Sequence, residues 1–222
     1  MLFIVATPLG NLGDITDRAK QILRENNLII AENPAYSKRL LQHFELGSDK
    51  TFIQYAEHNE LTMLPKILER LKSADAVLLS DAGTPGISDP GFRLVREAIL
   101  AGIQIVPIPG PSASIAALSA SGLPTNKFIF LGFVPKTEIK LIKELQKAKD
   151  IEATVIFYES PQRIFKTTAW IAKAWPDAQL VIARELTKIH EEFMRGSASQ
   201  ILEQLTKKAS IKGEITVVLS FK

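Results

Sequence analysis

Apolar residues in the first half of the chain alternate between short continuous runs and amphipathic stretches. The continuous runs predict buried strands at residues 2–6, 28–31, 51–55, 76–80 and 103–108. Between them, apolar residues recur every three or four positions, which predicts helices at 15–23, 37–44, 64–71 and 92–99 and from 112 onward. We place Pro65 in the first turn of its helix, where a missing backbone N–H costs nothing. The alternation predicts an α/β fold with a mainly parallel sheet covered on both faces.

The pattern changes at Gly122-Leu123-Pro124, after which the apolar runs lie closer together. Strands are predicted at 128–131, 154–158, 179–183, 193–194 and 215–221, with helices at 139–145, 164–175 and 201–205. The closer spacing indicates a mixed, partly antiparallel sheet. We therefore predict two α/β domains, residues 1–123 and 124–222.

The composition narrows the class of protein. With 222 residues, 46% hydrophobic and 23% charged, the chain is neither disordered nor collagen-like, and no apolar run reaches the roughly 18 residues of a membrane helix. Residues 1–6 lack a basic segment, so we interpret them as a first strand and not as a signal peptide. The absence of cysteine excludes disulfides, thiolate metal sites and cysteine nucleophiles, and the spacing of the histidines fits no metal site. A reducing cytoplasm is the expected location.

Charge is distributed unevenly along the chain, which carries +3 overall. Residues 1–110 hold 11 Lys/Arg against 13 Asp/Glu, and residues 111–222 hold 16 against 11. A basic second half can bind a polyanion, although a solvated lysine-rich surface also fits. One lysine set recurs at helical spacing: Lys136, Lys140, Lys143 and Lys147. This stripe can face RNA phosphates, but Glu138 and Glu144 interrupt it, so a solvated helix face fits as well.

Gly/Pro-rich loops follow three predicted strands of the first half, at residues 7–14, 80–91 and 107–112. In a parallel sheet such loops leave one edge, which predicts a small-molecule site built from main chain. None matches G-x-G-x-x-G or G-x-x-x-x-G-K-[ST], so neither a dinucleotide nor a nucleoside triphosphate has motif support. Single features also have structural interpretations; Asp89-Pro90, for example, fits the N-cap and first turn of the next helix.

These loops carry a resemblance to a known family. Residues 7–14, 80–91 and 109–112, followed by 132–135, 157–160, 183–188 and 212–214, resemble the tetrapyrrole methylase superfamily and, within it, the ribosomal RNA small subunit methyltransferase I group. The resemblance implies two α/β domains with S-adenosylmethionine in the cleft between them, in a homodimer. The implied reaction is 2′-O-methylation of a cytidine in small-subunit ribosomal RNA.

The resemblance also implies which residues contact the cofactor. They are Pro8, Ala82, Gly83, Thr84, Ile87, Ser112, Ala113, Tyr158, Glu159, Arg195, Gly196 and Gly213. Those of the first half coincide with the Gly/Pro-rich loops, whereas those of the second half rest on the resemblance alone.

The sequence departs from the group at three places. Glu32-Asn33-Pro34-Ala35 stands where members usually show Glu-Asp-Thr-Arg, and the basic stretch after Val134-Pro135 is thin. The chain also ends soon after residues 215–221, where many members have a longer tail. Two alternatives follow: a methyltransferase of the same fold acting on a tetrapyrrole or other small molecule, and a cofactor-binding protein without catalysis.

Methyl transfer to a ribose hydroxyl needs an aligned acceptor oxygen and a general base. The candidate catalytic residues are Asp81, Asp89, Glu159, Arg184, Glu185 and Lys188. We assign the Asp81/Asp89 loop to orienting the acceptor or cofactor, and residues 184, 185 and 188 to the acceptor side. The Lys188 cation can steady an alkoxide or a phosphate. For Arg184-Glu185, an internal ion pair without a catalytic role is the alternative.

Overall fold

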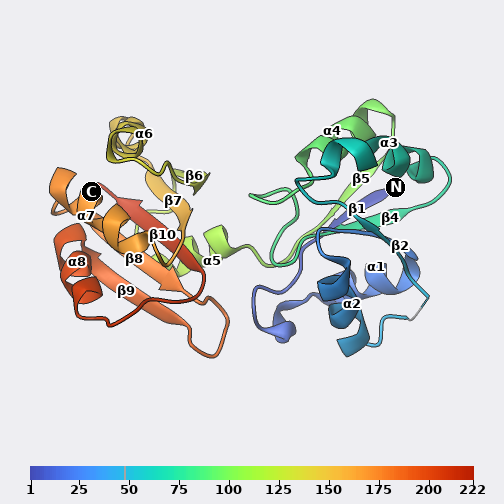
Figure 1. Cartoon of the computed structure of the whole chain (residues 1–222), viewed down its shortest axis with the longest axis horizontal. Coiled ribbons are helices and arrows are strands. Elements are labelled where there is room, and N and C mark those ends of the chain that lie inside the picture. The colour runs from blue at the N-terminus through green and yellow to red at the C-terminus, as the bar shows by residue number, and fades with distance from the viewer. Residues whose placement is uncertain (48) are drawn as a thin grey trace. The chain divides into compact units, whose positions relative to one another are not determined.

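The computed structural model describes residues 1–47 and 49–222, which form two compact units, Met1–Ser112 and Ala113–Lys222 (Figure 1). The first unit contains a five-stranded sheet in the order β3-β2-β4-β1-β5, and all its neighbouring strands are parallel. Its strands are β1 (Leu2–Val5), β2 (Leu28–Ala31), β3 (Thr51–Gln54), β4 (Ala76–Leu79) and β5 (Ile105–Ile108). The predicted parallel α/β sheet is confirmed.

Helices cover both faces of this sheet, as Figure 1 shows. They are the short 3-10 helix η1 (Leu12–Asp14), α1 (Asp17–Glu25), α2 (Pro34–His43), α3 (Glu60–Leu71) and α4 (Phe92–Leu100). Successive side chains of a strand point to opposite faces. Phe3 and Val5 therefore join the hydrophobic cluster of α1 and α2, while Leu2 and Ile4 join that of α3 and α4. Burial on both faces explains why these strands read as continuous apolar runs.

Proline positions follow from local structure, with one exception. Pro34 occupies the first turn of α2, and Pro107 lies in β5 at the sheet edge, where a missing donor is tolerated. The prediction for Pro65 is wrong, because α3 begins at Glu60 and Pro65 lies inside the helix. Its ring removes the N–H that would bond to the carbonyl of Leu61, a residue whose side chain is exposed to solvent.

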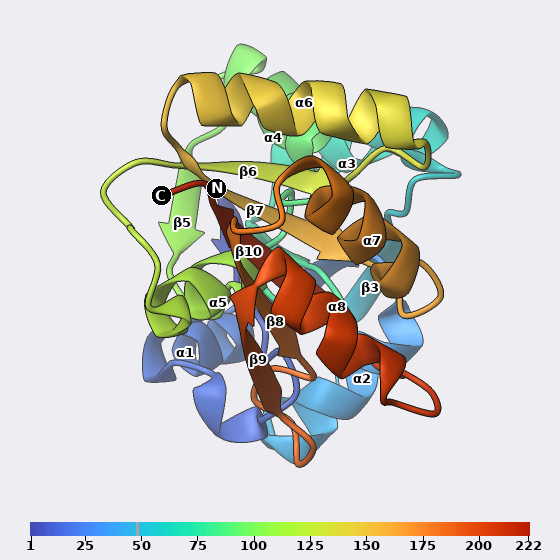
Figure 2. The same cartoon turned by 90° about the vertical axis from the view of Figure 1, so that its left-hand side faces the viewer.

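The second unit contains a mixed sheet in the order β6-β7-β10-β8-β9. Its strands are β6 (Phe128–Phe133), β7 (Thr154–Glu159), β8 (Gln179–Arg184), β9 (Glu192–Ser197) and β10 (Ile215–Ser220). Only β6 and β7 run parallel; the other neighbours are antiparallel, which confirms the predicted mixed sheet. Helices α6 (Glu138–Asp150), α7 (Ile164–Ala174) and α8 (Ala198–Thr206) pack on one face around a shared core (Figure 2).

Helix α5 (Ala113–Ser121) belongs to the second unit. Its Ala117 and Leu118 pack against Ile156 and Val218, on the sheet face that the other helices of the unit leave open. The units consequently divide before α5, whereas the sequence pattern placed the division after it. Among the described residues, no helix combines the length and hydropathy that crossing a bilayer would require.

Candidate functional site

The three Gly/Pro-rich loops of the first unit meet at the carboxyl edge of its sheet. They leave β4, β1 and β5, which are adjacent strands. Thr7 and Gly83 exchange backbone hydrogen bonds of 2.8 and 3.0 Å, joining the first loop to the second. The Thr84 hydroxyl donates to the Pro111 carbonyl at 3.0 Å, joining the second loop to the third. The convergence predicted from the sequence is therefore present.

Two glycines permit this close packing of main chain. A Cβ on Gly110 would lie 2.9 Å from the Cβ of Ala6, a separation that real side chains do not show. Gly83 has φ +80° and its added Cβ would lie 3.2 Å from Cδ2 of Leu9. A larger residue at position 110 would push the loops apart, and the positive φ of Gly83 disfavours any other residue, so both glycines serve the close packing of the loops on one another.

The middle loop does not use Asp89 as a helix cap. Helix α4 begins at Phe92, its N-cap residue is Gly91, and no side chain caps it. The structural interpretation of Asp89-Pro90 is therefore wrong. The Asp89 carboxyl is instead hydrogen-bonded to the Ser80 side chain, in a loop that is longer than a strand–helix turn needs.

Three carboxyl groups influence one another at this edge. Glu32 follows β2 and Asp81 follows β4, and these two strands are neighbours. Burial, followed by the charge of Glu32, raises the pKa of Asp89 to about 6. Burial also raises the pKa of Asp81, although the Asn33 N–H donates to its carboxylate, and burial and Asp81 raise that of Glu32. One Asp81 oxygen is buried without a hydrogen-bond partner. Such a cluster is typical of a site that holds or moves a proton.

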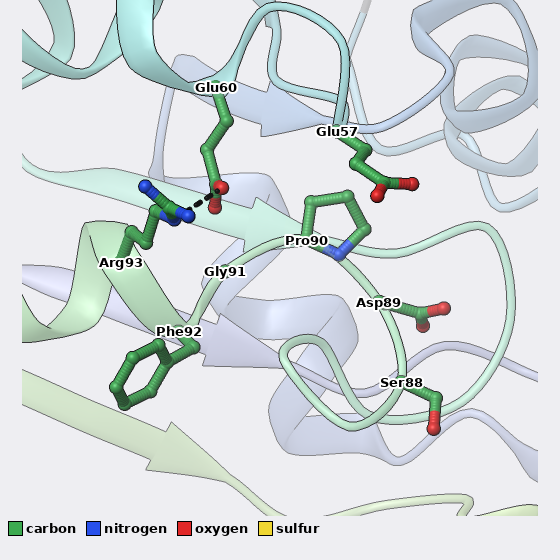
Figure 3. A pocket seen from close by; sticks show the side chains of 8 residues that line it. All are labelled: Glu57, Glu60, Ser88, Asp89, Pro90, Gly91, Phe92 and Arg93. Atoms are coloured by element: carbon green, nitrogen blue, oxygen red, sulfur yellow. Dashed lines mark ion pairs between the residues drawn. The ribbon is translucent and has the colours of Figure 1, made fainter. Parts of the chain in front are cut away.

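An open hollow of about 290 Å³ adjoins the middle loop (Figure 3). It is lined by Glu57, Glu60, Ser88, Asp89, Pro90, Gly91, Phe92 and Arg93. Glu60 is already engaged, by Arg93 at 3.1 Å and by the Tyr55 hydroxyl at 2.8 Å. In Figure 3 the side chains of Glu57 and Asp89 point toward the same side, away from that pair. The sequence alone gives Glu32 and Glu57 no role. They follow β2 and β3, and only the order of strands in the sheet shows that these strands end beside the loop after β4.

Glu159 has a different environment from the two aspartates. Its side chain is fully buried at the end of β7. It accepts hydrogen bonds from the Thr167 hydroxyl at 2.6 Å and the Ser160 N–H at 2.7 Å, and it pairs with Arg163 at 3.2 Å. Arg163 in turn donates to the carbonyls of residues 134 and 135. These contacts fasten β7 to α7 and give the carboxylate a structural role.

Arg184, Glu185 and Lys188 form a closed polar corner after β8. Arg184 pairs with Glu192 at 3.0 Å, and Lys188 pairs with Glu185 at 2.9 Å and with Glu214 at 3.0 Å. Hydrogen bonds from Lys188 and from the Glu214 N–H lower the pKa of Glu185. Arg184 and Glu185 are thus both engaged in internal ion pairs, as the alternative interpretation expected. They pair with Glu192 and Lys188, however, and not with each other.

Gly213 is packed against this corner. A Cβ there would lie 2.5 Å from the Glu185 carboxyl group, and φ is +92°. The sheet register sets Glu159 and Arg184 on either side of Ile215, so Gly213 lies at the edge that they share.

The remaining residues implied by the resemblance are dispersed. Pro8 is buried and Ile87 is 45% exposed, both in first-unit loops, and Ser112 and Ala113 stand where the two units meet in sequence. The Tyr158 ring contacts the rings of Phe130 and Phe133. Arg195 and Gly196 lie farther along β9, opposite Val181 and Leu180, and Arg195 donates to the Ala120 carbonyl at 2.7 Å. The structure therefore groups the first-unit residues closely but separates Arg195 and Gly196 from the edge that holds Glu159 and Gly213.

The parallel sheet with its three converging loops, followed by a mixed α/β unit, is the architecture of a known family. The family model for tetrapyrrole (corrin/porphyrin) methylases matches residues 1–202, and the chain belongs to this family.

Curated relatives resemble the chain over nearly its whole length. A protein of Hydrogenobaculum sp. (strain Y04AAS1), named ribosomal RNA small subunit methyltransferase I, is 44% identical over 221 residues, covering 99% of this chain and 95% of its own. A protein of the same name from Thermotoga maritima is 43% identical over 224 residues, covering 100% and 98%.

Solved structures show the same fold at low sequence identity. A diphthine synthase superposes with a TM-score of 0.76 at 18% identity, covering 99% of this chain and 89% of its own. The methyltransferase CobJ superposes with a TM-score of 0.73 at 19% identity, covering 98% and 92%. These likenesses establish the fold and confirm the predicted pair of α/β domains.

Proposed function

We propose that the protein is an S-adenosylmethionine-dependent methyltransferase that methylates the 2′-oxygen of a cytidine in small-subunit ribosomal RNA. The observation that carries the proposal is the convergence of the three loops, held by the Thr7–Gly83 and Thr84–Pro111 hydrogen bonds, in a chain with full-length relatives named for this activity. The family membership supports methyl transfer, and the names of the relatives support the class of acceptor.

The loops fit a small ligand bound mainly by main chain. Gly83 and Gly110 let the three loops pack closely on one another, and we propose that the backbone groups of residues 82–84 contact a ligand at the edge that the loops share. We propose that Pro8, Ile87 and residues 82–84 hold S-adenosylmethionine, which supplies a methyl group already activated on sulfur. The second-unit contacts implied by the resemblance remain predictions.

Asp89 is the proposed general base. As the acceptor oxygen attacks the methyl carbon, the ribose hydroxyl must lose its proton, and a carboxylate with a pKa of about 6 is largely ionised yet still basic at neutral pH. The charges of Glu32 and Asp81 would help to keep the pKa of Asp89 high, and the hydrogen bond from the Ser80 side chain would orient its carboxyl group. Since Arg184, Glu185 and Lys188 are engaged with their own partners, we propose that their corner positions the acceptor without accepting a proton.

The test measures transfer of labelled methyl groups to small ribosomal subunits that lack the modification. We expect incorporation by the wild type and at least a hundredfold loss in Asp89→Asn, the usual range for removal of a general base. Asp177→Asn is the matched control, since Asp177 is exposed on the second unit and its variant should keep full activity. Calorimetry with S-adenosylmethionine should show that both variants still bind the donor.

The same assay separates the alternative functions. Transfer to a tetrapyrrole precursor but not to the ribosomal subunit would show that the acceptor is a tetrapyrrole. The departure of residues 32–35 from the usual sequence of the group is the reason for testing this acceptor. Donor binding without transfer to either would indicate a cofactor-binding protein. No donor binding at millimolar concentration would contradict the proposal as a whole.

We also propose that the protein acts in the cytoplasm as a homodimer. A ribosomal RNA acceptor supports the location, and the resemblance supports the dimer. Light scattering of the purified protein tests the oligomeric state, and a mass of 24.5 kDa in solution would contradict it.

A further inference from the structure

Helix α6 carries an exposed row of lysines on a well-packed support. Its inner side chains Leu141, Leu145 and Ala148 are buried in the core of the second unit. The exposed lysines are Lys140, Lys143 and Lys147 on the helix, with Lys136 just before it. Figure 2 shows α6 as an outer helix that lies beside β6. At 1.5 Å per residue, the three helical lysines span about 10 Å of helix axis.

The acidic residues that interrupt this row in the sequence do not neutralise it. Glu138 pairs instead with Lys173 of α7 at 2.9 Å, and Asp150 accepts a hydrogen bond from Gln146 at 2.6 Å. Among the residues that the structure describes, Glu144 forms no ion pair with the row. None of the four lysines of the row pairs with a carboxylate in that part of the chain. Within the described residues, lysines at adjacent turns of one helix are therefore free of ion pairs, with Glu144 the one acidic side chain that lies between them in the sequence.

Several other lysines of the chain do have a carboxylate or aromatic partner. Lys72 pairs with Glu69 at 2.6 Å, Lys207 with Glu203 at 2.6 Å and Lys222 with Glu152 at 2.9 Å. Lys149, on the same helix, lies over the rings of Trp175 and Phe221. The row is thus a local concentration of positive charge in a unit whose acidic groups are largely engaged elsewhere.

We infer that the α6 lysine row binds the phosphate backbone of the RNA acceptor. The inference rests on the proposed function. Cations without ion pairs, at regular spacing on a rigid helix, match a series of phosphates and would gain affinity by releasing counterions. The carboxyl groups at the first-unit edge repel phosphates, so the phosphates farther along the strand from the reacting ribose are better matched by the basic second unit.

A lipid surface is the other polyanion that a basic helix can bind. A helix that lies in a membrane interface must expose its apolar face. Here that face is buried, and Ile139, which is 82% exposed, is the large apolar side chain of α6 that remains open. The geometry therefore favours RNA over membrane.

The experiment compares the salt dependence of binding to small-subunit ribosomal RNA transcribed in vitro. The variant Lys140→Gln/Lys143→Gln/Lys147→Gln is set against Lys72→Gln/Lys207→Gln/Lys222→Gln, which loses the same charge from paired lysines. We expect about tenfold or greater loss of affinity at 50 mM salt for the α6 variant, and a slope of log affinity against log salt that is less negative by about 2–3. The control should lose little of either.

The other outcomes distinguish failure of the inference from failure of the proposed function. Equal affinity and slope in the two triple variants would contradict it even if the wild type methylates RNA, leaving the proposed function intact. Loss of binding to phosphatidylglycerol vesicles with unchanged RNA binding would assign the row to a membrane. A wild type that binds RNA with the expected slope but transfers no methyl group would contradict the proposed function and not the lysine row. No RNA binding by the wild type at 50 mM salt would contradict both.

Discussion

The Asp89 carboxyl group lies where ionisation is unfavourable. It is partly buried and faces the charges of Glu32 and Asp81, and together these raise its pKa from 3.8 to about 6. A group of this kind reduces stability when it ionises, because the folded state binds its proton more tightly than the unfolded chain does. An environment that disfavours the charged carboxylate in this way is common where a protein needs a base near neutral pH.

A pH-dependent stability follows from this shift. The free energy of unfolding of the wild type should decline as pH rises from about 4 to about 6, the interval between the unfolded and folded pKa values. Asp89→Asn removes this cost, so its stability relative to the wild type should improve by about 1 kcal/mol across the same interval, after discounting for solvent screening. Urea unfolding at pH 4, 5, 6 and 7 measures the difference, and a difference independent of pH would contradict the assignment.

Sequence patterns alone do not distinguish the two kinds of carboxylate at the candidate site. Asp89 and Glu159 both follow strands and were both candidates for catalysis. The structure separates them, because the Glu159 carboxylate is enclosed by Thr167, Ser160 and Arg163 whereas Asp89 borders an open hollow. The partners of Glu159 lie within eight residues of it, and only the turn into α7 brings them back onto its oxygens.

At the scale of elements, α3 contains a defect that the sequence pattern concealed. The helix begins four residues before the first clear apolar repeat, so Pro65 falls in its interior. The side chain is exposed and makes no packing contribution that compensates for the missing hydrogen bond. Pro34, in contrast, occupies the first position of α2, where no intrahelical partner is lost.

Replacing these prolines by alanine should therefore have unlike effects. Pro65→Ala restores the hydrogen bond from residue 65 to the Leu61 carbonyl and should raise the free energy of unfolding by about 1–2 kcal/mol. Pro34→Ala should change it by a few tenths of a kcal/mol or slightly reduce it. Thermal and urea unfolding of both variants provide the measurement. An equal effect of the two substitutions would show that helix position does not determine the result.

At the scale of the whole molecule, each unit has its own core. Leu94 is fully buried between α4 and the parallel sheet, and Leu145 is fully buried between α6 and the mixed sheet. The clusters that contain them share no residues. Two independent cores make local loss of structure in one unit possible without loss in the other.

Shortening a buried side chain in one core should therefore reduce the stability mainly of the unit that contains it. Leu94→Ala and Leu145→Ala should each cost about 2–5 kcal/mol in the unit that contains the residue. Hydrogen exchange read by mass spectrometry should show faster exchange in residues 1–112 for the first variant and in 113–222 for the second. Equal acceleration in both units would mean that the chain unfolds as one cooperative body.

The sequence by itself determined the periodic features of this protein. Alternating apolar runs specified the strands and most helices, and Gly/Pro-rich segments marked the loops of the candidate site, because strand and helix periods and turn chemistry are local properties. The tertiary structure decided which strands are neighbours, and hence that Glu32 joins Asp81 and Asp89 and that α5 packs with the second unit. It also decided that Glu138 pairs with Lys173 and not with the α6 lysines. Those outcomes depend on contacts between distant segments, which only the packing of the folded chain fixes.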